Sequence, residues 1–290
     1  MRSTAPQALW ATAMVRLRSN RSAMLGGGIV LGFTAACCLG PPLAAVFLDL
    51  HYDHQDLNLG VTAPAWRHPC GTDLHGRDLL LRILCGGQVS LAVGLLAAGV
   101  AAGIGTLYGA ISGYAGGRVD GLMMRIVDVI YALPYMFLVI LMATLFGKSL
   151  VLLFAALGLV GWLTTARLVR GQVLSLRERE FVQAARSLGS SHLTILGRHL
   201  IPNTLGPLLV YFTLSVPSMI LQEAFLSFLG LGVQAPRPSL GSLISDGAAD
   251  MTLFWWLLLF PASSMALLLF ALHFLGDGLR DALDPQLRKP

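Results

Sequence analysis

Residues 83–117 read ILCGGQVSLAVGLLAAGVAAGIGTLYGAISGYAGG, a stretch without a charged side chain. About 20 apolar residues in a helix cross a bilayer, so this stretch is more than long enough to do so. Strands of a membrane β-barrel would alternate apolar and polar residues over about 10 positions. Here the apolar run is continuous and rich in Leu, Ala and Gly, which predicts a membrane-spanning helix.

Five more uncharged stretches flank this one. They occupy residues 22–48, 129–147, 149–166, 200–222 and 251–272. The whole chain of 290 residues is 55% hydrophobic and 12% charged, with a mean hydropathy of +0.71, whereas soluble domains carry roughly 25% charged residues. The sequence therefore predicts an all-α polytopic membrane protein with six transmembrane helices.

Basic residues near the ends of the spans predict the orientation. With a cytoplasmic N-terminus, most of them fall in the cytoplasm, and the outside carries only Arg67, Arg77, Arg82, Lys148 and Arg237. We expect both termini in the cytoplasm, and the net charge of +5 reflects this asymmetry, with no indication of nucleic-acid binding. The predicted segments are a cytoplasmic or interfacial N-terminal helix (1–21), a first transmembrane helix (22–49), an extracytoplasmic loop (50–82), a transmembrane core (83–277) containing a charged loop (177–202), and a cytoplasmic tail (278–290).

The predicted extracytoplasmic loop carries several histidines and aspartates, which raises the possibility of a metal site. Its Pro64, Pro69 and Gly71 indicate an extended, turn-rich segment, and no His-x-x-x-His pair lies on a predicted helix. We interpret it as an ordered loop without metal. Cys70 lies in this loop, and the four cysteines show no paired spacing.

Glycines recur at four-residue intervals in the stretch quoted above. Gly99 and Gly103 form one set, and Gly105, Gly109 and Gly113 form another. Small residues at this interval let helix backbones approach closely in a membrane. The spacing predicts a face packed against another helix.

Residues 177–202, REREFVQAARSLGSSHLTILGRHLIP, form a charged island in this apolar chain. Phe181, Ala184, Ala185 and Leu188 recur at helical spacing, and Gly189 permits a backbone reversal. A second apolar stripe then leads to Pro202. The pattern predicts a helix, an elbow and a second helix, and periodicity alone leaves a docking element and a plain connecting loop open. Because the chain contains no nucleotide-binding sequence, any energy source would be a partner.

Three ionisable residues lie within or beside the predicted spans: Asp128, Glu223 and His273. Such residues usually face a bundle interior or an aqueous path. We take Glu223, its neighbour Gln222 and Asp128 as candidate pathway residues. The alternatives are a hydrogen-bonded buried carboxylate for Glu223 and a pair with Arg125, one turn away, for Asp128.

A pattern within the charged island resembles the EAA loop of bacterial ATP-binding-cassette importer permeases. It consists of Gln-Ala-Ala at 183–185, then Gly189, then His-Leu-Ile-Pro at 199–202. The usual pattern has Glu-Ala-Ala and Ile-x-Leu-Pro, so Gln183, His199 and Ile201 depart from it. Residues 68–78 (HPCGTDLHGRD), 225–236 (FLSFLGLGVQAP) and 276–285 (GDGLRDALDP) are similar to the oligopeptide and dipeptide permease subfamily, so the resemblance covers nearly the whole chain.

This resemblance implies a type I importer permease fold and a non-catalytic transport subunit in the bacterial cytoplasmic (inner) membrane. Its implied partners are a homologous B-type permease, two cytosolic ATPases that hold ATP and Mg, and an extracytoplasmic peptide-binding protein. The chain itself would hold no cofactor or metal. Gln183, Ala184, Ala185, Gly189 and Pro202 become the predicted ATPase-coupling residues. The predicted cargo is an oligopeptide or dipeptide; the alternatives are nickel or another small solute, and, in other classes, an ion-coupled carrier or a membrane scaffold.

Overall fold

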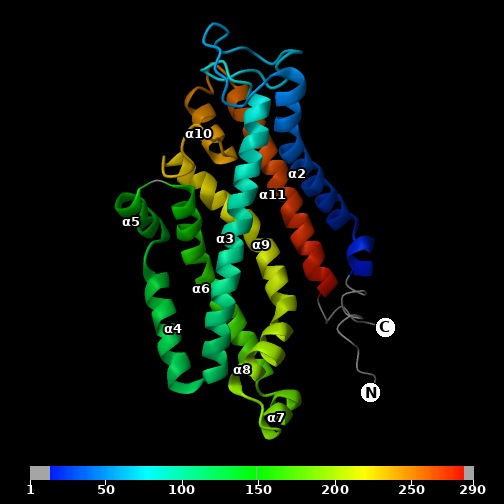
Figure 1. Cartoon of the computed structure of the whole chain (residues 1–290), viewed down its shortest axis with the longest axis vertical. Coiled ribbons are helices and arrows are strands. Elements are labelled where there is room, and N and C mark those ends of the chain that lie inside the picture. The colour runs from blue at the N-terminus through cyan, green and yellow to red at the C-terminus, as the bar shows by residue number, and fades with distance from the viewer. Residues whose placement is uncertain (1–13, 148, 284–290) are drawn as a thin grey trace.

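The computed structural model describes residues 14–147 and 149–283, and this part of the chain is helical without a named strand. A single isolated bridge joins Thr72 to Asp78. The predicted all-α class is therefore confirmed. Four helices run side by side along the long axis of the molecule (Figure 1). They are α2 (Arg21–Leu48), α3 (Leu79–Ala115), α9 (Ile201–Phe228) and α11 (Trp256–Leu283).

These four helices are long and apolar enough to cross a membrane, and α9 does so as part of a continuous helix from His192 to Phe228. The shortest candidate span has 28 residues, about 42 Å at 1.5 Å per residue. A hydrocarbon core is about 30 Å thick, so each helix exceeds it.

The third predicted span, residues 129–147, is broken in the structure. Helix α4 (Gly117–Ala132) and helix α5 (Tyr135–Phe146) meet at an angle of 81°. Pro134 lies at the break with an extended backbone, and it has no N–H to continue a helix. Helix α6 (Leu150–Leu176) has 27 residues and runs past the predicted end of the fourth span. With the bent pair counted as one span, the helices are compatible with the six predicted spans.

One of the two predicted glycine sets forms a helix interface. A Cβ added at Gly105 would lie 2.5 Å from Cβ of Thr165, and one at Gly113 would lie 2.9 Å from the carbonyl oxygen of Arg170, both in α6. A Cβ at Gly99 or Gly103 would meet nothing within 4 Å in the described part of the chain. Only the set beginning at Gly105 therefore brings α3 and α6 into close backbone contact.

The two ends of the molecule differ in structure (Figure 1). At the end we call the loop end, residues 49–78 form an irregular segment beside helix α10 (Leu240–Ala249). At the opposite end, the α7 end, lie α7 (Glu180–Ser187), α8 (His192–Thr194) and a π-helical segment, η1 (Ile195–Leu200). Helix α11 continues past residue 277 to Leu283, so part of the predicted tail is helical; residues 1–13 and 284–290 lie outside the described residues.

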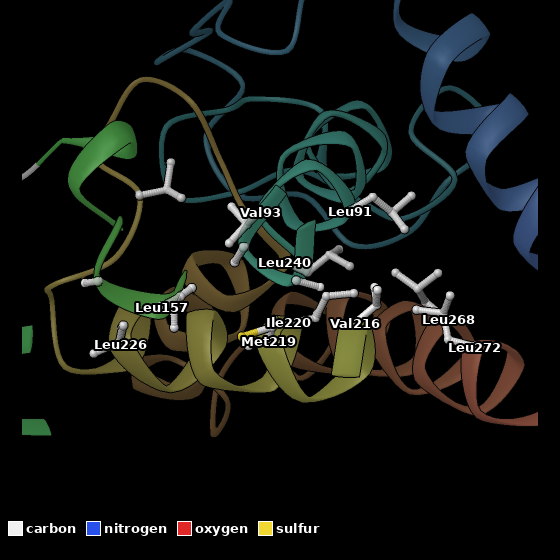
Figure 2. Packing of buried hydrophobic residues seen from close by; sticks show 14 of the residues in the cluster. Leu91, Val93, Leu157, Val216, Met219, Ile220, Leu226, Leu240, Leu268 and Leu272 are labelled. Atoms are coloured by element: carbon white, nitrogen blue, oxygen red, sulfur yellow. The ribbon is translucent and has the colours of Figure 1, made fainter. Parts of the chain in front are cut away.

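The main apolar core lies where α3, α6, α9, α10 and α11 meet (Figure 2). Val93, Leu157, Ile220, Leu240 and Leu268 are all fully buried there. A second cluster lies under the α7 end and joins buried residues of α3, α6, α7, η1 and α9. The charged island packs on the protein through this second cluster.

Candidate coupling tip and translocation cavity

Helix α7 ends in a tight reversal at Gly189. The backbone of Gly189 has φ +76°, a region that a residue with a Cβ rarely adopts. The Gly189 N–H donates to the carbonyl of Arg186 and the Ser190 N–H donates to that of Ala185, both at 3.0 Å. This pair of bonds is a Schellman motif, which satisfies carbonyls left open at a helix end. The predicted elbow is therefore present at the predicted residue.

The second arm of the elbow continues directly into the membrane. Ser191 caps it by accepting a hydrogen bond from the N–H of Thr194, and the helix then runs from His192 through η1 into α9. Pro202 is exposed in the first turn of α9. π-Helical turns occur often at functional sites in helices. Continuous helical backbone thus links the elbow to α9.

The apolar residues of α7 divide between two faces. Val182 is fully buried and Ala185 is 7% exposed, and both pack into the second core cluster. Phe181, Ala184 and Leu188 point outward, with Leu188 86% exposed. We call these three residues, together with the exposed Leu193, the tip face. Ala184 and Ala185 differ by about 100° in direction around the helix, so the predicted apolar stripe is buried at Ala185 and exposed at Phe181, Ala184 and Leu188.

The predicted coupling residues follow this division. Gln183, Ala184 and Gly189 are exposed on α7 and at its end, whereas Ala185 holds α7 on the core. The side chain of Gln183 donates a 3.2 Å hydrogen bond from Nε2 to the carbonyl of Glu178. The three exposed residues are thus accessible to a partner, and Ala185 is not.

Tyr114, at the end of α3, joins the elbow to the bundle. Its hydroxyl lies 2.8 Å from Nδ1 of His192, and the guanidinium of Arg186 lies 5.3 Å from its ring centre. Arg177 Nη1 donates to the carbonyl of Gly113 at 3.0 Å. Sequence analysis missed this junction because Tyr114 lies in an apolar span and its partners lie in the charged island.

A buried ion pair ties α4 to α6 near the same end. Asp120 is 7% exposed and accepts two hydrogen bonds from Arg170, from Nε at 2.5 Å and from Nη2 at 2.6 Å. The hydroxyl of Ser112 donates a further bond to this carboxylate at 2.6 Å. Sequence analysis also missed this pair; the signal was an aspartate directly after an uncharged span, with an arginine at the end of another.

Asp128 is placed differently from both predicted alternatives. It forms an exposed ion pair with Arg167 of α6 at 2.8 Å, and Arg125 is not its partner in the described structure. The guanidinium of Arg167 also lies 4.5 Å from the ring centre of Tyr131. This ion pair therefore links α4 to α6 at the protein surface.

A cavity of about 580 Å³ opens between the α4–α5 bend, α6 and α9. One side of α9 lines it at helical spacing, and this side carries Tyr211, Leu214, Ser215, Ser218 and Gln222. The other polar groups on its wall are the hydroxyls of Tyr131, Tyr135 and Thr164, and no charged side chain of the described residues lines it. Ligand sites of about 300–1,000 Å³ commonly combine apolar walls with a few polar groups. Gln222 is thus placed on a cavity wall.

Glu223 points the other way, into the core between α3, α9 and α10. It is fully buried, and its carboxylate accepts hydrogen bonds from Ser90 at 3.1 Å and Ser227 at 2.7 Å. The Ser90 hydroxyl in turn accepts from the N–H of Leu240, at the start of α10. Of the two neighbours predicted as pathway residues, the structure places Gln222 on the cavity and Glu223 outside it.

Residues of the loop end bond to one another. His68 Nδ1 lies 2.8 Å from Asp78, and Asp78 also caps α3 by accepting from the N–H of Leu81. Asp73 pairs with Arg77 and Arg82. Within the part of the chain that the structure describes, no group of His, Cys, Asp and Glu has the arrangement of a metal site. His273, in α11, lies away from the loop-end residues above in the sequence. Within the described part of the chain, its Nδ1 forms a hydrogen bond with the carbonyl of Leu269 in the same helix.

A bundle of helices long and apolar enough to cross a membrane, with a cavity beside α9 and an exposed tip at α7, is compatible with a transport permease. Residues 105–289 match the family of inner membrane components of binding-protein-dependent transport systems, and residues 8–64 match the N-terminal transmembrane domain of oligopeptide transport permease C. The chain belongs to this family of inner membrane transport permeases.

Several known permeases match nearly all of the chain. It is 48% identical over 284 residues to the oligopeptide transport system permease protein OppC of Haemophilus influenzae, which covers 97% of this chain and 90% of the relative. It is 49% identical to OppC of Escherichia coli K12, over 97% and 93% of the two chains. The dipeptide transport system permease protein DppC of Bacillus subtilis is 44% identical, over 94% and 85%. The resemblance drawn from the sequence is therefore confirmed.

Proposed function

We propose that this chain is the C-type permease subunit of an importer that carries oligopeptides or dipeptides across the bacterial inner membrane, driven by ATP hydrolysis in partner subunits. Its partners would be a homologous B-type permease, two cytosolic ATPases and an extracytoplasmic peptide-binding protein. The names of the relatives support the cargo. The α7 end would face the cytoplasm and the loop end the outside, in keeping with the distribution of basic residues.

One observation carries the proposal: the tip and the cavity share a helix. The stretch from His192 to Phe228 begins at the elbow beside the tip face and includes the cavity-lining side of α9. A rigid helix moves as a unit, so a pull on the elbow by an ATPase would shift one cavity wall relative to α6. Switching between inward and outward access by such rigid movements is a known type of transition.

The lining of the 580 Å³ cavity suits a peptide. Each peptide unit presents one N–H donor and one carbonyl acceptor. Hydroxyls of Tyr211, Ser215 and Ser218, with the amide of Gln222, both donate and accept hydrogen bonds. Because the described lining has no charge, it would not discriminate strongly among peptide side chains. A nickel ion would be expected to meet histidine or carboxylate ligands, which this lining lacks among the described residues.

Reconstitution tests this function directly. The chain would be assembled in lipid vesicles with its B-type permease, both ATPases and the peptide-binding protein, and ATP hydrolysis would be measured with and without peptide. We expect hydrolysis to rise on addition of peptide and labelled peptide to accumulate inside. Stimulation by nickel but not by peptide would contradict the peptide cargo, and uptake without ATPases would contradict the class.

Two substitutions test the coupling assignment. Gly189→Pro is incompatible with φ +76°, because proline fixes φ near −65°, and Ala185→Glu places a charge in the second core cluster. We expect both to abolish ATPase binding in co-purification from membranes. Gly206→Ala is the control, because its added Cβ would meet nothing within 4 Å of the described residues. Unchanged ATPase binding in both variants would remove the coupling role from this loop.

A further inference from the structure

A second cavity of about 300 Å³ lies at the loop end, apart from the cavity beside α9. Its walls are the residue 73–82 segment, α10 and the first turn of α11. Leu243 and Leu257 supply part of an apolar wall. Unlike the larger cavity, this one is lined by charged side chains: Asp73, Arg77, Arg82, Asp246 and Asp250.

Arg82 is the buried group of this cavity. It is 5% exposed, and its Nη1 lies 2.9 Å from Oδ2 of Asp73. Its Nε has no hydrogen-bond partner among the described residues. A buried donor without a partner is costly, especially in a charged group. Arg82 therefore brings to the cavity wall a guanidinium that has one nitrogen without a partner among the described residues.

The acceptor that is nearest to Arg82 is already engaged. Asp73 accepts from Arg77 Nε at 2.7 Å, and from the backbone N–H groups of His75 at 2.9 Å and Arg77 at 3.0 Å. Arg77 thus compensates the charge of Asp73. The positive charge of Arg82 remains on one side of the cavity.

Two aspartates of the α10 region also line the cavity. They are Asp246 and Asp250, and no ion pair within 4.0 Å joins either to Arg82 in the described structure. Partial desolvation raises the pKa of the Asp246 carboxyl although the residue is exposed, and Arg82 and Arg77 oppose the rise. An ammonium group bound beside Asp246 would favour its ionised form.

We propose that this cavity binds a dipeptide with both termini free, its carboxylate on the guanidinium of Arg82 and its ammonium group on Asp246 and Asp250. This inference rests on the proposed function and adds a peptide site on the outer face of the permease. The cavity is at the small end of ligand sites, about 300 Å³, and an extended dipeptide spans about 7 Å. Leu243 and Leu257 would accept either side chain without strong preference.

Equilibrium binding of labelled alanyl-alanine tests the site. The complete importer, without its peptide-binding protein, would be placed in lipid nanodiscs. We expect saturable binding that falls at least tenfold with Asp246→Asn and with Arg82→Gln. N-acetyl-alanyl-alanine and alanyl-alanine amide, each lacking one terminal charge, should lose affinity to a similar extent on the unaltered protein. Glu178→Gln, an exposed carboxylate at the α7 end, is the control and should bind normally.

Several results would overturn the site. These are an absence of saturable binding, equal binding of blocked and free dipeptides, or unaltered affinity in the Asp246→Asn importer. A loss of affinity for the peptide-binding protein, with free dipeptide binding unchanged, would make the cavity a protein contact instead. The blocked dipeptides use the unaltered protein, so they decide the matter even if Arg82→Gln does not assemble.

Failure of the site and failure of the proposed function give different results. The same preparation would be supplied with its peptide-binding protein, and peptide-stimulated ATP hydrolysis would be measured. If stimulation is normal while the dipeptide does not bind, the site is wrong and the function stands. If neither is observed, the proposed function is also wrong.

Discussion

Glu223 is a single buried carboxylate where α3, α9 and α10 meet. Its two oxygens accept from Ser90 and Ser227. Glu223→Ala would leave both hydroxyls without this acceptor and would open a void, so we expect a loss of about 2–4 kcal/mol in unfolding free energy. Denaturant unfolding of the detergent-solubilised chain measures it. Glu223→Gln should lose less, because its amide oxygen still accepts.

Gln222 provides the matched control for that measurement. It lines the large cavity, so Gln222→Ala removes no core contact and should unfold at nearly the same denaturant concentration as the unaltered chain. Equal destabilisation by Gln222→Ala and Glu223→Ala would contradict the placement of Gln222 on the cavity wall and Glu223 in the core.

Cys70 gives a pH-dependent prediction in the loop. Burial, with a smaller contribution from Asp78, raises the pKa of its thiol from 9.0 to about 11. The thiol is therefore protonated at neutral pH, and its reactive thiolate fraction is roughly 100-fold below that of an unshifted thiol. In a variant that keeps only this cysteine, alkylation by iodoacetamide should be slow at pH 8 and should accelerate as pH rises toward 11. A rate at pH 8 equal to that of an unfolded control would contradict its burial.

The sequence identified Gln222 and Glu223 as candidate pathway residues, but it could not show which of them lines the cavity. Successive residues in an α-helix differ by about 100° in direction, so adjacent positions can face a cavity and a core. The packing of α3 and α10 decides which of the two side chains faces the core and which faces the cavity. Nothing near residue 222 in the sequence carries that information, because Ser90 lies 133 residues from Glu223.

At the scale of helices, Gly109 holds α3 against α6. A Cβ added there would overlap the backbone carbonyl of Ala166. We expect Gly109→Ala to lower the thermal unfolding temperature of the solubilised chain. Gly103→Ala is the matched control in the same helix, and its Cβ meets nothing within 4 Å of the described residues. It should be neutral or stabilising by about 0.5–1 kcal/mol, because alanine is the better helix former. Equal effects of the two variants would contradict this interface.

The glycine spacing predicted that interface but assigned it too many residues. Four-residue spacing identifies a helix face that permits close approach, and only the partner helix determines how far the contact extends. Proline positions had the same ambiguity. Pro207, Pro217 and Pro261 lie inside continuous helices, whereas Pro134 lies at an 81° bend. A proline removes one helical hydrogen bond wherever it lies, and whether the helix continues past it depends on the surrounding packing.

At the scale of the whole molecule, contacts between distant segments join the elbow to α3 and join α4 to α6. Tyr114 and His192 are 78 residues apart, and Asp120 and Arg170 are 50 apart. Hydrophobic runs predicted the spans, and helical periodicity with Gly189 predicted the elbow, because both signals are local in sequence. These junctions depend on helix packing, so the sequence alone did not reveal them.

The continuous backbone between the tip and the cavity leads to a final prediction. Gly197 lies in η1, and Gly197→Pro would remove a backbone donor there and clash with the preceding turn. The tip face precedes this break, so ATPase subunits should still bind, whereas displacement of the elbow would no longer reach α9 as a rigid movement. We expect ATP hydrolysis to persist and peptide uptake to fall at least tenfold in reconstituted vesicles.

Gly197→Ala distinguishes the effect of a broken helix from the effect of replacing glycine. Its Cβ meets nothing within 4 Å in the described structure, and alanine keeps the backbone donor, so uptake and hydrolysis should both stay near those of the unaltered importer. Full uptake by Gly197→Pro would mean that force reaches the cavity by another route, of which the Tyr114 junction with α3 is the one that the contacts provide. Combining Gly197→Pro with Tyr114→Phe would then stop uptake, because that change removes the hydroxyl bonded to His192 and leaves the ring in place.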